Sequence, residues 1–476
     1  MKLQLSDNNL LFLFILISIL LRFFSFFPSV LDHDESTYMI IGRDILNGKS
    51  LYTDVTDTKP VGIFLFYAFM EFLFGGSIFM KRLVFAIIVG ITAYLISGVS
   101  KKMFANKNVT FASGLIYIIY TSTWTLHGRS PNTELLFNLT TISTLLLFLN
   151  PGKANFFWGG LITGVGFIIK YLVLFDLAAF MLFFFIVDII SNRNIIKSVS
   201  FWLRYLLAGM GFLIPFGLVN VWFWLSGNYD AFYFITFELP SNYGNNPSLT
   251  RYLTMLLDFT AKFLPISYMF FYVVSRREKP VSVRQGCFFL LWIIFILVAI
   301  YLPGREFSHY TVQLMLPFSL LAGIFFHTDF RTDRITSKIF SRKTGLAFLI
   351  AGTIIIQAIT FNNEIIDPDY PREIAELIEE DLKPGEQIYV SNYEHVIYYL
   401  LDLNTPTRFV HSVLLFSDYH KAFNINAVRE IQRIIAAKPA FIVVERKNEL
   451  VEKMIKENYR LIRRFRDNEI KLYKRN

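Results

Sequence analysis

Long runs of apolar residues constrain this chain more than any motif does. Residues 10–27 are almost purely apolar, and similar runs recur along most of the 476-residue sequence. A helix needs about 20 mostly apolar residues to cross a lipid bilayer. Because 54% of the residues are hydrophobic and only 17% are charged, the chain fits a polytopic membrane protein rather than a soluble one. No small-residue cleavage site follows the first run, so we expect a permanent span there.

The apolar runs predict about eleven membrane-spanning helices and therefore a mainly α fold. The predicted spans cover residues 9–28, 83–100, 109–126, 134–149, 156–169, 171–190, 201–225, 255–274, 286–302, 310–327 and 344–361. The two short spans within 156–190 leave open a re-entrant pair, which would keep later loops on the same sides. Residues 60–79 are also apolar, but a span there would reverse the side of every later loop.

Basic residues gather on one side of the predicted spans. The loops on that side carry 17 basic and five acidic residues, whereas the other side of the membrane part has 11 basic and 13 acidic ones. The positive-inside rule makes the basic side cytoplasmic. The N-terminus is then inside, and residues 29–82 form one long outer loop with helices on the membrane surface. Topology thus accounts for the net charge of +9, and we expect no nucleic-acid partner.

Residues 362–476 differ in character from the rest, with 18 basic and 19 acidic residues. Strands are expected at 386–390, 407–410 and 440–445, helices at 395–403, 427–438 and 450–459, and a closing hairpin after them. The chain therefore divides into a membrane domain, 1–361, and a small extracytoplasmic α/β domain, 362–476. This second domain shows no metal-ligand spacing, phosphate loop or hydrolase elbow, which favours a structural or substrate-guiding role.

The first outer loop begins with an unusual group of carboxylates. In "LDHDESTYMIIGRD", Asp34 and Glu35 follow Asp32 directly beyond the first span. A helical stripe comes next, so Asp34 can be a plain helix N-cap. A cap needs only one carboxylate, however, and ionisable groups at a membrane edge usually have a function. Both interpretations stay open from the residue types alone.

The same loop continues with "DVTDTKPVGIFLF", which places Asp57 and Lys59 before an apolar helix. Lys59 can be an ordinary lysine that reaches the membrane surface along its apolar stem. A lysine at the level of the headgroups is also a natural partner for a lipid phosphate.

A later outer turn, "HGRSPNTELLF", contains Arg129 and Glu134. Ser130 followed by Pro131 predicts the start of a helix at this point. Glu134 then lies in the first helical turn, where the helix dipole favours an acid. The acid therefore has a purely structural explanation beside the functional one.

Another short outer loop, "PGREFSHYTVQ", brings together Arg305, His309 and Tyr310. The span that follows needs no such polar cluster for its stability. Arg82 and Lys170 reach the same face, where either can be a simple membrane-edge anchor.

Acids and cations thus gather on one membrane surface. A carboxylate can remove a proton from an acceptor hydroxyl, and cations can stabilise the charge on a departing phosphate. This combination suits group transfer from a lipid phosphate, a lipid phosphatase or a flippase for lipid-linked sugars. A transporter would instead place charges near the bilayer midplane on broken spans. A non-catalytic scaffold gives no reason for the cluster.

The acidic pair, the "GRDILNG" helix, "YTDVTDTKP" and the "RL" before the second span resemble the first outer loop of the GT-C glycosyltransferases. Within that superfamily the chain is similar to the bacterial relatives of protein O-mannosyltransferases and to the aminoarabinose transferases of lipid A. The resemblance covers roughly residues 9–330 and includes "GRSPNTELLFNL" and "REFSHYTVQLMLPFSLL". The tail resembles the small outer domain of many bacterial members.

This resemblance implies a membrane enzyme that moves a sugar from a polyprenyl-phosphate carrier to an acceptor hydroxyl, with inversion at the anomeric carbon. It assigns the catalytic carboxylate to Asp34, with Glu35 beside it, and the second acid to Glu134. It assigns the contacts with the donor phosphate to Lys59 and Arg82.

Further site residues are expected on the same grounds. Arg305 joins the donor-phosphate group, and the candidates for substrate binding are Asp57, Arg129, His309 and Tyr310. The chain departs from the family where "KPV" replaces "KPP", and where Thr58 stands at the position of an acid, which leaves the role of Asp57 open.

No metal or other cofactor is expected, because fixed cations can neutralise the leaving phosphate. The expected partners are a polyprenyl-phosphate sugar, membrane lipids and an acceptor that is a protein, lipid A or a glycan. The expected location is the bacterial plasma (inner) membrane, with the C-terminal domain outside. The sequence names neither the sugar nor the acceptor.

Overall fold

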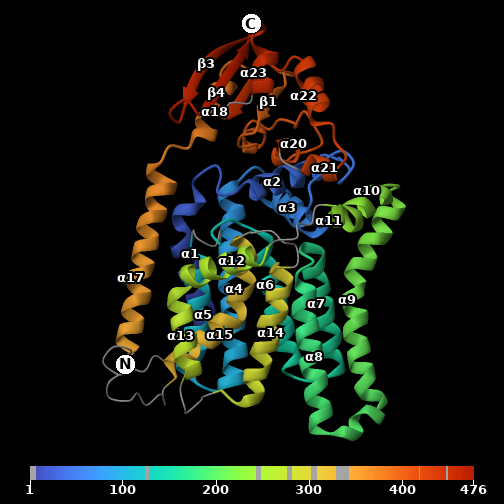
Figure 1. Ribbon diagram of the computed structural model, residues 1–476, viewed down its shortest axis with the longest axis vertical. Coiled ribbons are helices and arrows are strands. Elements are labelled where there is room, and N and C mark those ends of the chain that lie inside the picture. The colour runs from blue at the N-terminus through green and yellow to red at the C-terminus, as the bar shows by residue number, and fades with distance from the viewer. Residues whose placement is uncertain are drawn as a thin grey trace. The chain divides into compact units, whose positions relative to one another are not determined.

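The computed structural model (Figure 1) describes residues 7–123, 128–242, 248–275, 281–301, 308–327, 342–416, 419–445 and 449–476. Its internal contacts divide the chain into two units. We call Met1–Phe26, Arg82–Val219 and Asn245–Ile365 the helical unit, and Phe27–Lys81, Asn220–Gly244 and Ile366–Asn476 the mixed unit. The domain boundary expected after residue 361 stays a prediction. The contacts group the first outer loop with the tail.

Apolar helices at the predicted positions build the helical unit. They are α1 (Asp7–Arg22) with η1 (Phe23–Phe26), α4 (Ile78–Phe104), α5 (Lys107–Thr121), α6 (Thr133–Phe148), α7 (Lys153–Ile169), α8 (Val173–Ser191), α9 (Val199–Leu225), α12 (Leu249–Lys262), α13 (Leu264–Ser275), α14 (Val283–Tyr301), η5 (Ser308–Leu314), α15 (Met315–Gly323), η6 (Ile324–Phe326) and α17 (Arg342–Phe361). Helix α6 packs on α7, α5 on α15, and α8 on α14. Every predicted span falls on one or more of these helices.

Six helical segments within the described residues are long and apolar enough to cross a membrane. They are Asp7–Phe26, Ile78–Phe104, Val173–Ser191, Val199–Leu225, Val283–Tyr301 and His309–Phe326. Helices α6 and α7 are apolar but shorter. A polytopic membrane protein is thus confirmed, whereas the number of eleven spans stays a prediction.

The span expected at 255–274 is interrupted. Helix α12 ends at Lys262, and α13 begins two residues later at Leu264. Pro265 explains the break, because proline lacks the N–H that continues a helix and its ring collides with the preceding turn.

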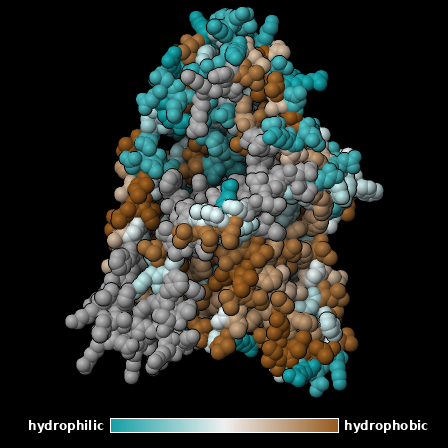
Figure 2. Space-filling model, viewed as in Figure 1, coloured by the Kyte–Doolittle hydropathy of each residue, from teal (hydrophilic) through white to brown (hydrophobic). Residues whose placement is uncertain are grey.

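The exposed surface of the helical unit is apolar over α7, α8, α9 and α14 (Figure 2). Exposed side chains there include Trp158, Leu182, Leu213 and Leu290. Apolar surface of this extent is typical of contact with lipid rather than with water.

Helices α7 and α9 approach so closely that glycine is required between them. A Cβ atom on Gly211 of α9 would lie 2.3 Å from the Phe157 carbonyl oxygen and 2.9 Å from the Leu161 nitrogen of α7. Small residues commonly allow such backbone approach between membrane helices. Gly209, on the same helix, has nothing within 4 Å of its Cβ position.

In the mixed unit, the first outer loop forms helices α2 (His33–Leu46) and α3 (Val61–Phe74), which pack on each other. A Cβ on Gly42 of α2 would lie 2.7 Å from the Tyr67 backbone of α3. At 14 residues, α3 is shorter than the about 20 residues of a span. Its exposed face carries Leu65, Phe69 and Phe72, as a helix on a membrane surface would.

The tail forms a four-stranded sheet of order β1-β2-β4-β3. Strand β1 (Ile388–Ser391) runs parallel to β2 (Phe441–Glu445), while β3 (Tyr459–Phe465) and β4 (Ile470–Arg475) are antiparallel to their neighbours. The helices of the mixed unit beyond α3 are α10 (Tyr229–Tyr233), η4 (Phe234–Glu238), α11 (Leu239–Asn242), α18 (Tyr370–Glu379), α19 (Val396–Leu400), α20 (Val413–Phe416), α21 (Tyr419–Ala422), α22 (Ala427–Ala436) and α23 (Glu449–Ile455). The core includes Tyr389, Ile434, Ile442 and Val451.

The strand expected at 407–410 is wrong, whereas the closing hairpin β3–β4 is present. Phe409 instead forms a single β-bridge with Thr56 of the first outer loop, and the Thr56 N–H donates to the Arg408 carbonyl at 2.8 Å. The β-forming residues of this segment therefore pair with one distant residue rather than with the sheet.

Replacing Gly211 with alanine should destabilise the protein, and replacing Gly209 with alanine should not. The added methyl at Gly211 collides with the α7 backbone, and overpacking of this kind costs about 1–3 kcal/mol. At Gly209 the change removes only backbone freedom, which stabilises a helix slightly. Thermal unfolding in detergent measures both. Equal melting temperatures for the two variants would contradict the close approach of α7 and α9.

Candidate active site

Asp32, not Asp34, caps helix α2. The Asp32 backbone is extended, with φ −155°, and its Oδ1 accepts the Asp34 N–H at 2.9 Å. The interpretation of Asp34 as the N-cap is therefore wrong. Asp34 lies one residue inside the helix, where its carboxylate is available for another contact.

Asp34 pairs with Lys59, the other singled-out residue of the loop. The Lys59 Nζ donates to both carboxylate oxygens, at 2.9 and 2.8 Å, and the side chains are only 12% and 16% exposed. Burial opposes the charge on Lys59, but Asp34, Tyr38 and Asp57 together outweigh it, Asp34 most strongly, and the pKa of Lys59 is well above its usual value. The structure thus joins the proposed base and the proposed phosphate ligand in one buried ion pair.

Two further acids of the first outer loop, Asp57 and Glu35, are also buried. Asp57 is 2% exposed, and within the described residues its Oδ2 has no hydrogen-bond partner. It acts electrostatically on Lys59. Glu35 is fully buried and acts on Lys81, which forms an ion pair with Glu71 at 2.8 Å.

Three histidines surround Asp34, and sequence reasoning missed all of them. His411 Nε2 lies 3.8 Å from Asp34 Oδ1. The rings of His33, His395 and His411 lie with centroids 5.2 to 5.7 Å apart. His395 and His411 belong to the tail and stand in no local motif, so only the fold reveals the cluster.

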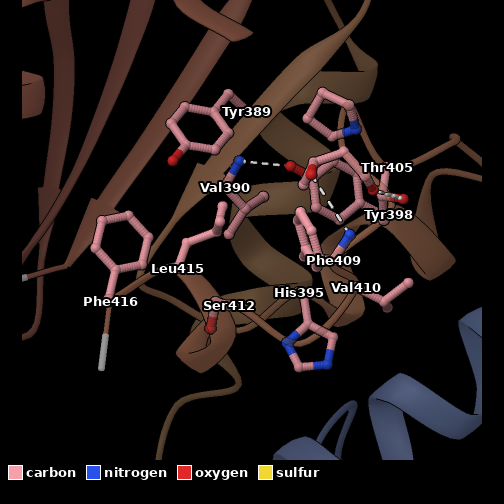
Figure 3. A pocket seen from close by; sticks show the side chains of 12 residues that line it. Tyr389, Val390, His395, Tyr398, Thr405, Phe409, Val410, Ser412, Leu415 and Phe416 are labelled. Atoms are coloured by element: carbon pink, nitrogen blue, oxygen red, sulfur yellow. Dashed lines mark hydrogen bonds between the residues drawn. The ribbon is translucent and has the colours of Figure 1, made fainter. Parts of the chain in front are cut away.

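His395 also lines a small cavity of the mixed unit, together with Tyr389, Tyr398, Phe409 and Ser412 (Figure 3). Its volume of about 20 Å³ is sufficient for one water molecule. The cavity is too small for a sugar or a lipid, so it is no candidate for the donor site.

The second acidic site lies in the helical unit. Glu134 Oε1 is 3.3 Å from the Lys170 Nζ, and both side chains are buried. The Lys170 Nζ lies 4.5 Å from the centre of the Tyr310 ring, and His309 packs edge-on against Tyr310. His309 also acts electrostatically on Glu134. Three predicted site residues and Lys170 are thus brought together.

Helix α6 begins later than the sequence suggests. Ser130 and Pro131 lie in a turn closed by the Asn132 N–H on the Ser130 carbonyl at 2.8 Å. Asn132 is the N-cap residue, and the helix starts at Thr133. Glu134 keeps its expected place in the first turn.

The predicted arginines have internal partners. Arg82 is buried and donates to the Ser25 carbonyl at 2.9 Å. Arg129 forms a buried ion pair with Glu364, a residue that the sequence did not single out. Arg305 lies outside the described residues. Arg82 and Arg129 therefore hold the helical unit together.

Asp176, inside α8, is a buried acid that sequence reasoning missed. It accepts hydrogen bonds from Trp292 at 2.6 Å, Gln313 at 2.7 Å and Thr141 at 3.2 Å. These donors come from α14, η5 and α6, so the carboxylate ties four segments together. A lone acid in an apolar run carries no signal that separates this structural role from a functional one.

Within the described parts of the chain, no three His, Cys, Asp or Glu side chains are placed to hold a metal ion. The expectation that no cofactor is needed stays a prediction.

Comparison with known proteins identifies the fold. Residues 58–222 match the family described as dolichyl-phosphate-mannose-protein mannosyltransferase. The structure of ArnT from Cupriavidus metallidurans bound to undecaprenyl phosphate is similar, with 13% identity, a TM-score of 0.66 and 98% of each chain covered. Arabinofuranosyltransferase AftD from Mycobacteria is similar at 11% identity and a TM-score of 0.53, over 99% of this chain and 40% of that one. The search of curated proteins returned no match.

The likeness to ArnT extends over nearly the whole of both chains and shows a common fold. The resemblance recognised in the sequence is therefore confirmed, together with the mainly helical fold and its small C-terminal sheet. The individual site residues stay predictions.

Asp32 should contribute stability that is lost as the pH rises from about 4 to 7, whereas the buried His395 and His411, whose pKa values are lowered, contribute in the opposite direction. Burial and the neighbouring Asp34 raise the pKa of Asp32 to about 7, whereas an unfolded aspartate titrates near about 3.9. At this carboxyl the folded state thus holds more protons than the unfolded state between these values, and the contribution of Asp32 to stability falls through that window.

Asp32→Asn should remove this contribution, because asparagine keeps the capping oxygen without the charge, so the variant should gain stability relative to the wild type at pH 8 compared with pH 4. Asp32→Ala should in addition cost about 1 kcal/mol through loss of the cap. Melting temperatures at pH 4 and pH 8 check both. An unchanged pH slope in Asp32→Asn would contradict the raised pKa.

Replacing one member of the Glu134–Lys170 pair should destabilise the protein more than replacing both. Glu134→Gln or Lys170→Met leaves one buried charge unpaired, which costs about 3–5 kcal/mol. The double variant should melt higher than either single variant. A pair at the same 3.3 Å distance, Lys101–Asp7, is exposed, so Lys101→Met should change little. Additive single losses would contradict the coupling.

Proposed function

We propose that this membrane glycosyltransferase of the GT-C fold transfers a sugar from a polyprenyl-phosphate carrier to an acceptor hydroxyl on the extracytoplasmic side. The observation that carries the proposal is the buried ion pair of Asp34 and Lys59. One side chain suits proton removal and the other suits phosphate binding, and both lie on the loop that follows the first span.

In the proposed reaction, Asp34 takes the proton of the acceptor hydroxyl. The acceptor oxygen forms a bond to the anomeric carbon as the bond from that carbon to the phosphate oxygen breaks. Lys59 stabilises the charge that grows on the leaving phosphate. Attack opposite the leaving group inverts the anomeric configuration. No redox partner is needed, and fixed cations serve in place of a metal.

The pairing of Asp34 with Lys59 has a consequence for the order of events. While Lys59 holds both carboxylate oxygens, it lowers the basicity of Asp34. A donor phosphate competes for the same ammonium group and draws it away. Asp34 therefore becomes a stronger base when the donor is bound, which couples donor binding to acceptor activation.

The other predicted residues take supporting roles in this proposal. Asp57 Oδ2 is buried and has no hydrogen-bond partner in the part of the chain that the structure describes, which suits a hydroxyl of the sugar as donor. Glu134, His309 and Tyr310 form a second polar site around Lys170, which suits contacts to the substrate. Arg305 remains the candidate for a second phosphate contact. Arg82 and Arg129, which have internal partners, support the helices.

The carrier is proposed to be undecaprenyl phosphate, since the similar ArnT structure contains that lipid. The proposed location is a bacterial inner membrane with a cytoplasmic N-terminus and an extracytoplasmic tail, as the loop charges favour. The acceptor is a protein, lipid A or a glycan.

A flippase for lipid-linked sugars is the second candidate, and it calls for charges near the bilayer midplane. Asp176 is a buried acid of a spanning helix, but it lies in the first turn of α8, and three protein donors bond to its carboxylate. A carboxylate saturated in this way suits a structural role and not a substrate path. The ion pair of Asp34 and Lys59 therefore favours the transferase.

Substitutions of Asp34 and of Lys59 should impair different steps of the reaction. Asp34→Asn should lower the transfer rate by about 10²- to 10⁴-fold, the usual contribution of a general base, while undecaprenyl phosphate still binds. Lys59→Met should weaken undecaprenyl phosphate binding by about 10- to 100-fold, because it loses a charged hydrogen bond. Mass spectrometry of glycans from a complemented deletion strain measures transfer, and titration of the purified protein measures binding.

The tail offers a matched control pair, since Lys474 and Asp381 also form an ion pair, at 2.6 Å, on its surface. Asp381→Asn and Lys474→Met should leave transfer and binding unchanged. Full transfer by both Asp34→Asn and Lys59→Met would defeat the proposed function.

A further inference from the structure

His411 comes from the tail and faces the carboxylate proposed as the base. Its side chain is 14% exposed, and its Nε2 lies 3.8 Å from Asp34 Oδ1. The ring stacks on His33 and packs against His395. Asp57 and Lys59 also act on it electrostatically. These five titratable side chains, from the described residues of the first outer loop and the tail, pack against the imidazole or act on it electrostatically.

The hydrogen bonds of His411 define which nitrogen carries its proton. The Val413 backbone N–H donates to His411 Nδ1 at 3.3 Å. A neutral imidazole accepts at one nitrogen and donates at the other, so its proton is on Nε2, the atom nearest Asp34. Burial lowers the pKa of His411 to about 4, which keeps the ring neutral near pH 7. His411 thus presents one N–H donor toward the carboxylate.

His395 packs against the His411 ring, with the two centroids 5.2 Å apart. The Thr37 hydroxyl donates to the His33 carbonyl at 3.0 Å, so its oxygen accepts the N–H of His395 Nε2 at 2.8 Å. Burial lowers the pKa of His395 well below its usual value, and the ring is neutral. Two uncharged imidazoles with fixed tautomers therefore form one wall around Asp34.

Asp34 has to change its partner during the proposed reaction. Lys59 now holds both of its oxygens, and the donor phosphate draws that ammonium group away. A largely buried carboxylate that loses its cation needs another donor, because an unpaired buried charge is costly. His411 stands one short movement away, since 3.8 Å is slightly beyond hydrogen-bond distance.

We propose that His411 is a positioning residue of the tail, which holds Oδ1 of Asp34 through its Nε2–H when Lys59 turns to the donor phosphate. The inference rests on the proposed function. Oδ2 is then directed to the acceptor hydroxyl, whose proton ends on Asp34, and no bond to His411 forms or breaks. The tail is thereby part of the active site.

Two substitutions of His411 test this role. His411→Leu removes the donor, whereas His411→Gln keeps an N–H at a similar position. The substrate is the undecaprenyl-phosphate sugar fraction extracted from the deletion strain. His411→Leu should lower kcat about 10- to 100-fold, the loss of one hydrogen bond to a charged group, with undecaprenyl phosphate binding unchanged. The acidic limb of its rate profile should move to higher pH, because the ionised carboxylate loses a donor.

His411→Gln should keep most of the rate and the position of the acidic limb. His420→Leu, a change to another tail histidine, on α21, is the control and should match the wild type. A normal kcat in His411→Leu, or an equal loss in both His411 variants, would overturn the proposal. If His411→Leu does not fold, His411→Gln is the remaining test. A rate close to that of the wild type supports the proposal, and a large loss overturns it. Full transfer by both Asp34→Asn and Lys59→Met would instead defeat the proposed function itself.

Discussion

The ion pair between Asp34 and Lys59 is the interaction on which the organisation of the first outer loop depends. Both side chains are largely buried, so neither charge is stable without the other. The pair joins the start of α2 to the residue before Pro60, where α3 begins, and so fixes the two helices against each other. An ion pair in this position is also easily reorganised, because a phosphate offers the ammonium group an equivalent partner.

The sequence was informative where the signal is local. Apolar runs placed the helices, and the short stretch from Asp34 to Lys59 contained both members of the central pair. The capping residue was misplaced by two positions, because Asp32 and Asp34 are equally good caps by type and only the backbone angle of Asp32 separates them. Likewise Ser130 and Pro131 form a turn, and Asn132 occupies the N-cap position.

Contacts between segments that are far apart in the chain could not be predicted from the sequence. Arg129 and Glu364 are 235 residues apart, and no pattern around either one indicates its partner. His411 and Asp34 meet where Thr56 pairs with the segment around Phe409. Asp176 looks like any acid in an apolar run until Trp292, Gln313 and Thr141 converge on it. Such networks depend on the tertiary arrangement, which a linear pattern does not encode.

The contacts between the first outer loop and the tail also determine when the loop can complete its folding during synthesis. Arg43 of α2 donates to the carbonyls of Tyr398 and Leu403, which lie 355 and 360 residues further along the chain. A ribosome adds about 5–20 residues per second, so this arginine waits roughly 20–70 s for its acceptors to be made. During that interval the first outer loop lacks its partners in the tail. Transcripts with a premature stop before the tail should therefore yield products for proteolysis rather than partly active enzyme.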